Sequence, residues 1–247
     1  MNDRAGSIVC QSNLSPITTL TLLHYPNLSD RFWALTQMQL AHRRLAAVPG
    51  LTFYRLMGSG GGNGFSLRPN LAVYAWLGQW SDAAAADRFF ADNEWFAEVG
   101  SHTDYRITFR LDATMAHGTW GSDNPFPPSP EKYDPDRPVA VLTRATIHPT
   151  KLLDFWRYVP QTSASVYDHP DRLLSLGVGE YPVFMQATFS LWRTGRAMTD
   201  FAYRSRYHKE VVQRTRERGW YRDELFARFQ LRSIHGEWPD LDITQLE

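Results

Sequence analysis

One histidine in the C-terminal third of the chain has the type and spacing of a cofactor ligand. Within residues 201–215, Phe201, Ser205, His208, Val212 and Thr215 follow the i, i+4, i+7, i+11, i+14 spacing of one helical face. We therefore expect a helix that turns His208 toward an apolar interior together with Phe201 and Val212. A neutral imidazole held there on a rigid element could bind a metal ion or a haem iron.

The same pattern also fits a histidine without a cofactor. A core or half-exposed imidazole that makes an ordinary hydrogen bond is the commoner occupant of such a position, so the helix pattern alone leaves both readings open.

The cysteine count restricts the possible iron chemistry. The single cysteine, Cys10, lies in a polar N-terminal segment. A disulfide, a thiolate-ligated haem, an iron–sulfur cluster or a cysteine-rich zinc site would each need cysteine in the folded body. No His-x-His or His-Glu-x-x-His spacing is present either, which disfavours a non-haem metal. Any iron should therefore be held by nitrogen or oxygen ligands.

Composition narrows the class of protein and of partner. The chain has 247 residues, is 43% hydrophobic and has a formal net charge of zero, which argues against nucleic acid as the main partner. No apolar run approaches the ~20 residues of a membrane span, and no signal peptide is visible. We expect a cytoplasmic protein; peripheral membrane association stays open, although no basic amphipathic anchor stands out.

The chain contains two halves with a similar plan. We expect an N-terminal tail at 1–19, a first ferredoxin-like repeat at 20–120, a proline-rich linker at 121–138, a second repeat at 139–238 and a C-terminal tail at 239–247. Both repeats show, in order, an apolar strand, a helix with a Phe-Trp pair, a Gly-x-Gly turn, a second strand ending in Trp, a second helix, and a His-Gly-x-Trp end. The paired motifs are Phe32-Trp33 and Phe155-Trp156, Gly58–Gly60 and Gly177–Gly179, Leu71–Trp80 and Val183–Trp192, and His117–Trp120 and His235–Trp238.

This order predicts an α+β fold. Strand–helix–strand–strand–helix–strand is the ferredoxin-like plan, and two tandem units packed sheet against sheet form a dimeric α+β barrel-like fold. Aligning Trp80 with Trp192 and Phe89 with Phe201 sets Phe96 opposite His208. Because this duplicated helix then carries a ligand-type residue only in its second copy, we expect the cofactor site in the C-terminal half.

Two strands of the second half carry further candidate site residues. Arg144 lies mid-strand in 139–147, where it could pair with a carboxylate or a haem propionate, polarise bound oxygen, or simply face solvent. We take it as a candidate catalytic residue. Met185, Ala187 and Phe189 share one strand face and could line an apolar cofactor pocket, with core packing as the alternative.

The glycine-rich stretch 58–64 resembles a phosphate-binding loop only superficially. It lacks the Gly-Lys-Ser/Thr ending of a P-loop, and it precedes a strand rather than a helix. We expect a flexible loop that could act as a lid.

Several stretches together resemble the spheroidene monooxygenase family, the acyclic carotenoid 2-ketolases of purple bacteria. The resemblance covers roughly residues 20 to 235. It is carried by 55–65 (RLMGSGGGNGF), 141–147 (VLTRATI), 201–204 (FAYR), His208 and 224–229 (ELFARF). The family also resembles the haem-binding dimeric α+β barrel enzymes, such as the aldoxime dehydratases, in which a helical histidine of the C-terminal repeat is the proximal ligand.

The resemblance implies a function and its partners. It implies a haem b protein with His208 as the axial ligand to iron, and a monooxygenase that uses O2 and reduced ferredoxin. The substrate would be small and hydrophobic, by resemblance an acyclic carotenoid hydroxylated at C-2 and carried on to the ketone. The alternatives are a haem-dependent dehydratase or N–O-cleaving enzyme of the aldoxime dehydratase type and a non-catalytic haem-binding protein. The basic residues between 204 and 218 would be either a solvated face or a docking surface for ferredoxin. A homo-oligomer also stays open.

Overall fold

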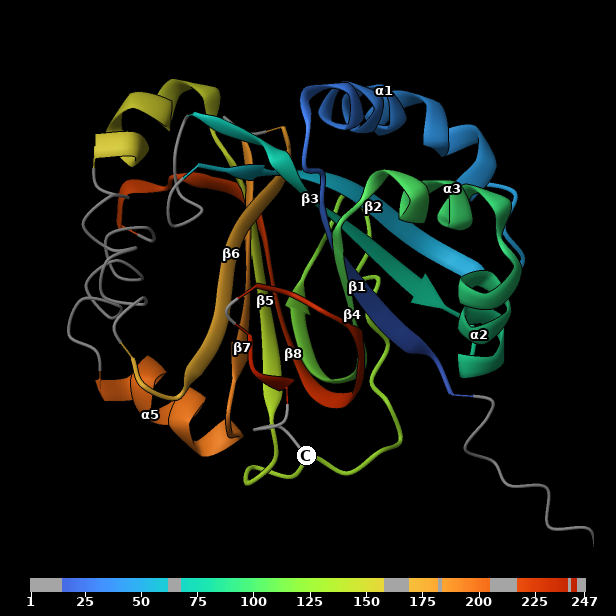
Figure 1. Cartoon of the computed structure of the whole chain (residues 1–247). Helices are drawn as coiled ribbons and strands as arrows, with labels where there is room; N and C mark the ends of the chain where they lie inside the picture. The colour runs from blue at the N-terminus through green and yellow to red at the C-terminus, as the bar shows by residue number, and fades with distance from the viewer. Residues whose placement is uncertain are drawn as a thin grey trace, which may run out of the picture.

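The computed structural model describes residues 15–61, 68–157, 169–181, 184–204, 217–239 and 241–243. The first half contains β1 (Ile17–His24), α1 (Leu28–Leu45), β2 (Leu51–Gly60), β3 (Pro69–Trp80), α2 (Ala83–Asp92), α3 (Glu94–His102) and β4 (Tyr105–Gly118). The second half contains β5 (Val139–Ile147), the 3-10 turn η2 (Pro149–Lys151), a helix over 152–157, β6 (Arg172–Tyr181), β7 (Met185–Trp192), α5 (Gly195–Arg204) and β8 (Tyr221–Gly236). Figure 1 shows the strands at the centre and the helices on the outside.

The eight strands form a closed antiparallel barrel in the order β1-β3-β2-β6-β7-β5-β8-β4. The first four strands lie in the order β4-β1-β3-β2, and the last four repeat it as β8-β5-β7-β6. This is the strand order of a ferredoxin-like unit, so the predicted α+β barrel of two such units is confirmed. On this basis we propose repeat boundaries close to 20–120 and 139–238.

The two Gly-x-Gly motifs lie where the halves meet. Gly58 pairs with Gly179 and Ser59 with Val178, and these are the register pairs between β2 and β6. The prediction that both motifs form turns is wrong, because each lies inside a strand. A Cβ added to Gly179 would come within 2.3 Å of the Met185 carbonyl oxygen, so close backbone approach explains this glycine. Of the expected glycine loop, residues 62–67 lie outside the described part of the chain.

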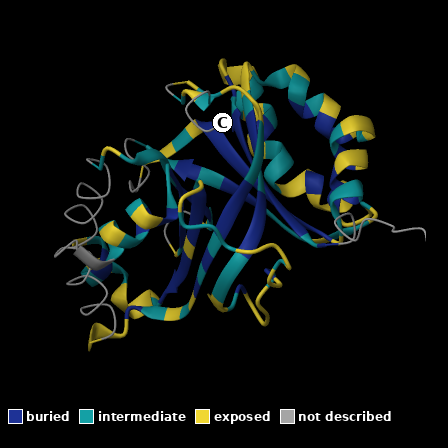
Figure 2. Ribbon diagram, turned by 90° about the horizontal axis from the view of Figure 1, so that it is seen from below, coloured by how far each residue is buried: buried dark blue, intermediate teal, exposed yellow. Residues whose placement is uncertain are grey.

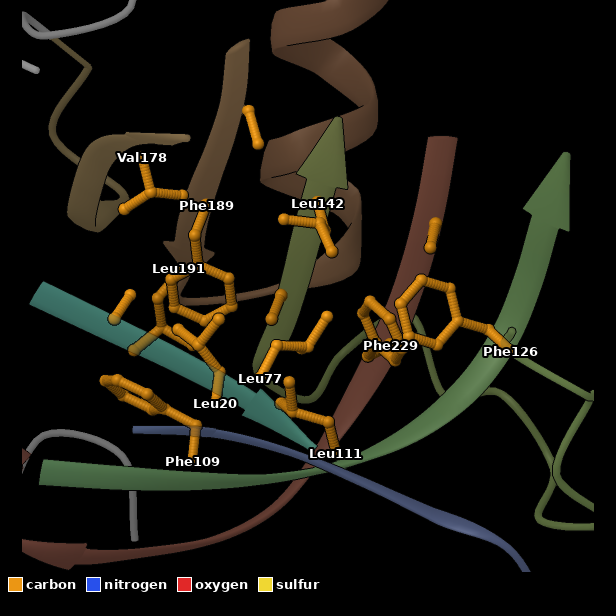
Figure 3. Close-up of a cluster of buried hydrophobic side chains, with 14 of the residues drawn as sticks. Leu20, Leu77, Phe109, Leu111, Phe126, Leu142, Val178, Phe189, Leu191 and Phe229 are labelled. Carbon is orange, nitrogen blue, oxygen red and sulfur yellow. The ribbon is translucent and has the colours of Figure 1, made fainter. Parts of the chain in front are cut away.

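The barrel interior is filled with apolar side chains. Figure 3 shows Leu20, Leu77, Leu142 and Phe189 pointing from different strands toward one another. Phe126, from the segment between the two halves, is only 2% exposed and packs edge-on against Phe229 at 5.1 Å. The interior is therefore a packed core rather than an open channel.

The helices begin at residues suited to capping. The side chains of Asn27, Asp82 and Asn93 accept hydrogen bonds from the first turns of α1, α2 and α3. These helices cover the outer face of the N-terminal strands, and Figure 2 shows their buried sides turned toward the sheet. No helix in the described ranges is both long and apolar enough to cross a membrane.

Candidate functional site

The outer face of the C-terminal strands carries two separate apolar clusters. Val139 and Val141 of β5 pack with Trp192 and Met198 at one end of this face. Ile147, at the end of the same strand, packs with Phe155 and Trp220. Because side chains alternate along a strand, Thr143 and Ala145 lie on the same face between the two clusters.

Small residues occupy most of the middle of this face, and the exception is Gln186 on β7, which lies opposite Ala145. Thr143 is exposed, although β5 is flanked by β7 and β8. It pairs with Thr188, which in turn pairs with Gly177 on β6. We call this surface the small-residue strip, and its members are Thr143, Ala145, Ser175, Gly177, Thr188 and Ser190.

The equivalent face of the N-terminal half is filled by large aromatic side chains. Trp80 pairs with Ile17 on the first strand of its half, as Trp192 pairs with Val139, so β3 and β7 correspond residue by residue. Trp76, four residues before Trp80, is fully buried and lies 4.8 Å from the ring of Phe89. The matching position on β7 is Thr188, which is only half-buried. Among the residues that the structure describes, no aromatic side chain of β7 takes the place in the second half that Trp76 takes in the first.

A flat apolar group fits the character of this strip. Short side chains let a planar ring lie close to the sheet, and the flanking clusters supply apolar walls. The Ser175 hydroxyl is buried without a hydrogen-bond partner within the described part of the chain, so it could satisfy a bound group. The described side chains of the strip are therefore compatible with a flat apolar ligand, whereas the equivalent N-terminal surface is already filled by Trp76.

The structure does not bring all the predicted cofactor residues together. Phe201 lies on the outer face, 5.1 Å from the ring of Trp192. Ala187 and Phe189 point to the opposite side of β7 and belong to the barrel interior, as Figure 3 shows for Phe189. Met185 is half-buried at the start of the strand. Strand alternation places Phe201 on the opposite side of β7 from Ala187 and Phe189, so these residues do not line one pocket. The outward residues of β7 are Gln186, Thr188, Ser190 and Trp192.

The two other predicted residues of this site, His208 and Val212, lie outside the described residues. The role of His208 as an iron ligand stays a prediction.

Arg144 points into the barrel interior. It is 5% exposed, so the alternative in which it faces solvent is wrong. Its guanidinium forms an ion pair with Asp223 of β8, and Asp223 also accepts a hydrogen bond of 3.1 Å from the Thr146 hydroxyl. Burial lowers the pKa of the Arg144 guanidinium, against the opposing effect of the nearby Glu180 carboxylate. Arg144 therefore faces away from the small-residue strip, and its catalytic role stays a prediction.

A half-buried ion pair lies near Arg144 and was missed from the sequence. Arg55 Nε lies 2.8 Å from Glu180 Oε1, and the indole of Trp120 donates a hydrogen bond of 2.8 Å to Glu180 Oε2. The guanidinium groups of Arg55 and Arg144 both lie 5.6 Å from the Trp120 ring. The sequence offered one indication of this pair: Arg55 alternates with Phe53 and Met57 along β2, which places it on the same strand face as these apolar residues.

Comparisons with known proteins agree with this architecture. No protein-family model matches the sequence. The chain is 36% identical over 228 residues to the spheroidene monooxygenase of Rhodobacter capsulatus, covering 92% of this chain and 95% of that protein. It is 34% identical over 225 residues to the spheroidene monooxygenase of Cereibacter sphaeroides, covering 91% and 69%. Among solved structures, an aldoxime dehydratase shares the fold with a TM-score of 0.61 and 12% identity, over 92% of this chain and 86% of that one. By its sequence, the chain belongs to the spheroidene monooxygenase family.

Proposed function

We propose that this protein is a haem-dependent monooxygenase that oxidises an acyclic carotenoid. Its relatives are named spheroidene monooxygenases and match nearly the whole chain, which supports an oxygenase acting on a long apolar polyene. The observation that carries the cofactor part is that Thr188 stands where the first half has Trp76, so that the described strands present a strip lined mainly by short side chains.

We assign the haem to the outer face of the C-terminal strands. The small-residue strip would bear one face of the ring, and His208, on the segment that follows α5, would be the axial ligand. The apolar clusters around Trp192 and Trp220 would exclude water from both ends of the ring. A hydrogen-bond acceptor on the second imidazole nitrogen would fix the tautomer of His208.

The proposed reaction inserts oxygen twice at one carbon. Bound haem would supply the activation of O2. Each turnover would take two electrons from a donor such as reduced ferredoxin and two protons, place one oxygen atom in the product and release the other as water. The first hydroxylation converts CH2 to CHOH, the second gives a geminal diol, and loss of water leaves a ketone. The protein would hold the polyene against the ring in one register, since regiochemistry depends on orientation.

Oxygen isotope labelling tests this proposal. Haem-loaded protein, ferredoxin, ferredoxin reductase and an acyclic carotenoid would be incubated under 18O2, and the product would be analysed by mass spectrometry. We expect oxygen uptake and one labelled hydroxyl after the first turnover. Conversion of an aldoxime without oxygen uptake would instead support the dehydratase alternative, and haem binding without either reaction would support the non-catalytic one.

A further inference from the structure

Helix α1 leaves an apolar stripe uncovered on its outer side. Its inner side is anchored by Ala34, Ala41 and Leu45, all at most 3% exposed. On the opposite side, Leu28, Phe32 and Leu35 are 80%, 69% and 50% exposed. Their i, i+4, i+7 spacing aligns them along one line of the helix. We call these three residues the α1 stripe.

A groove opens beside the α1 stripe, at the junction of the two halves. It has a volume of about 530 Å³ and lies between α1, β2 and the end of β6. Leu35 and Met38 line its α1 side, and Tyr181, which is 64% exposed, lies across from them on β6. The ion pair between Arg55 and Glu180 also borders it. An apolar molecule that reached the stripe would therefore meet an opening directly beside it.

The charges on α1 favour a negatively charged surface over an apolar protein partner. Its last turn carries His42, Arg43 and Arg44, and Arg43 continues the helical face of Phe32. Near the start of the helix, the Asp30 carboxylate lies 2.8 Å from His102 Nδ1 of α3 and is only 17% exposed, so it does not belong to the α1 stripe. The exposed face thus changes from apolar at its beginning to cationic at Arg43, whereas Arg44 is 2.6 Å from the Glu98 carboxylate and adds little net charge.

We propose that the α1 stripe docks this protein on an anionic phospholipid bilayer. The leucines and Phe32 would enter the acyl boundary, while Arg43 would contact headgroup phosphates. The choice of bilayer rests on the proposed function, because a long apolar polyene resides in the membrane. Docking would turn the groove between α1 and Tyr181 toward that reservoir.

A second copy of the chain fits this surface less well. In a symmetric contact between two antiparallel α1 helices, the basic end of one would face the apolar beginning of the other. A stable dimer also needs ~800 Å² of buried surface on each partner, more than one stripe of three side chains offers. A bilayer instead presents acyl chains and anionic headgroups side by side.

Vesicle flotation tests the docking surface without any need for catalysis. Full-length protein would be mixed with phosphatidylcholine vesicles, with and without about a third phosphatidylglycerol, and floated through a density gradient. We expect the parent to float mainly with the anionic vesicles. The double variant Phe32→Ser/Leu35→Ser should partition at least about tenfold less, since it removes two apolar side chains from the contact with the acyl chains. Arg43→Gln should lower only the binding to anionic vesicles.

The matched control is Leu153→Ser, which removes a leucine of equal exposure to Leu28 from the helix over 152–157. It should float like the parent. Circular dichroism would establish that every variant is folded. Absence of flotation by the parent, equal flotation of parent and double variant, or a parent dimer that the double variant dissociates would each overturn the proposal. Because these vesicles contain no carotenoid, such a failure would leave the proposed oxygenase activity untouched.

Discussion

Thr188 on β7 holds the position in the C-terminal half that Trp76 on β3 holds in the N-terminal half. Each lies four residues before a buried tryptophan that pairs with the first strand of its own half, Ile17 for Trp80 and Val139 for Trp192. Trp76 closes its face of the sheet together with the helices above it. Thr188 leaves the corresponding face lined mainly by small side chains among the described residues. The two halves therefore share one fold, but their equivalent outer faces carry side chains of different size.

Filling the strip should remove cofactor binding. We expect Thr188→Trp to fold but to lose the Soret band, because the indole would occupy the space that we assign to the haem ring. Thr188→Val has nearly the same volume as the parent residue and should retain the band. Absorption spectra of haem-supplied proteins, with circular dichroism as the folding check, measure both. An unchanged Soret band in Thr188→Trp would place the haem elsewhere.

The reciprocal change should damage the N-terminal half. Trp76→Thr leaves a large cavity beside Phe89, and we expect a loss of about 4 kcal/mol in the free energy of unfolding. It should not create a second haem site, because this half carries Phe96 where the alignment sets His208. Urea unfolding gives the stability, and the haem-to-protein ratio gives the stoichiometry. A stability change below ~1 kcal/mol would contradict the packing described here.

The interior ion pair of Arg144 and Asp223 offers a separate test. Asp223→Ala leaves the buried guanidinium uncompensated and should cost about 3 kcal/mol, whereas the apolar double variant Arg144→Met/Asp223→Leu should recover much of that loss. Thermal or urea unfolding measures both effects. If the double variant regains stability and oxygenase activity, Arg144 acts through packing. If it regains stability alone, the predicted catalytic role of Arg144 gains support.

One cluster beside the small-residue strip should make stability depend on acid. The Asp154 carboxylate accepts hydrogen bonds from the indole of Trp220 at 2.7 Å and from Arg218 at 2.6 Å, and these lower its pKa from the ordinary 3.8. A lowered folded-state pKa contributes stability above the unfolded value, and this contribution is lost as the pH falls through the folded value. We therefore expect Asp154→Asn to have a lower Tm than the parent at neutral pH. The difference in Tm between the two proteins should become smaller below pH ~4. Parallel curves of Tm against pH would contradict this.

The fold could be predicted because both halves of the sequence show the same order of strand and helix patterns. The strands ending in Trp80 and Trp192, and the apolar strand before each first helix, lie where the sequence plan expects them. The Gly-x-Gly motifs were misassigned because glycine marks both turns and close strand approach, and only the barrel shows that Gly58 and Gly179 are neighbours.

The site was less predictable because strand faces cannot be oriented from one sequence. Ala187 and Phe189 look like pocket residues, yet both are buried inside the barrel, whereas Met185 is half-buried at the start of β7. Thr188 points to the small-residue strip only when it is compared with Trp76, the residue at the equivalent position of the first half. The exposed α1 stripe could not be predicted for a similar reason. Apolar residues such as Trp33 and Leu40 occur on several sides of α1, so the sequence does not show which side packs against the sheet.

The most direct test of the account is the absorption spectrum of a His208→Ala variant beside the parent and a His235→Ala control. The control histidine lies at the end of β8, where its Nε2 is 3.0 Å from the Ser233 hydroxyl. We predict a Soret band in the parent and the control, its loss in His208→Ala, and its return when imidazole is added to that variant. An unchanged band in His208→Ala, or a folded parent that takes up no haem, would contradict the assignment of the haem to the C-terminal half.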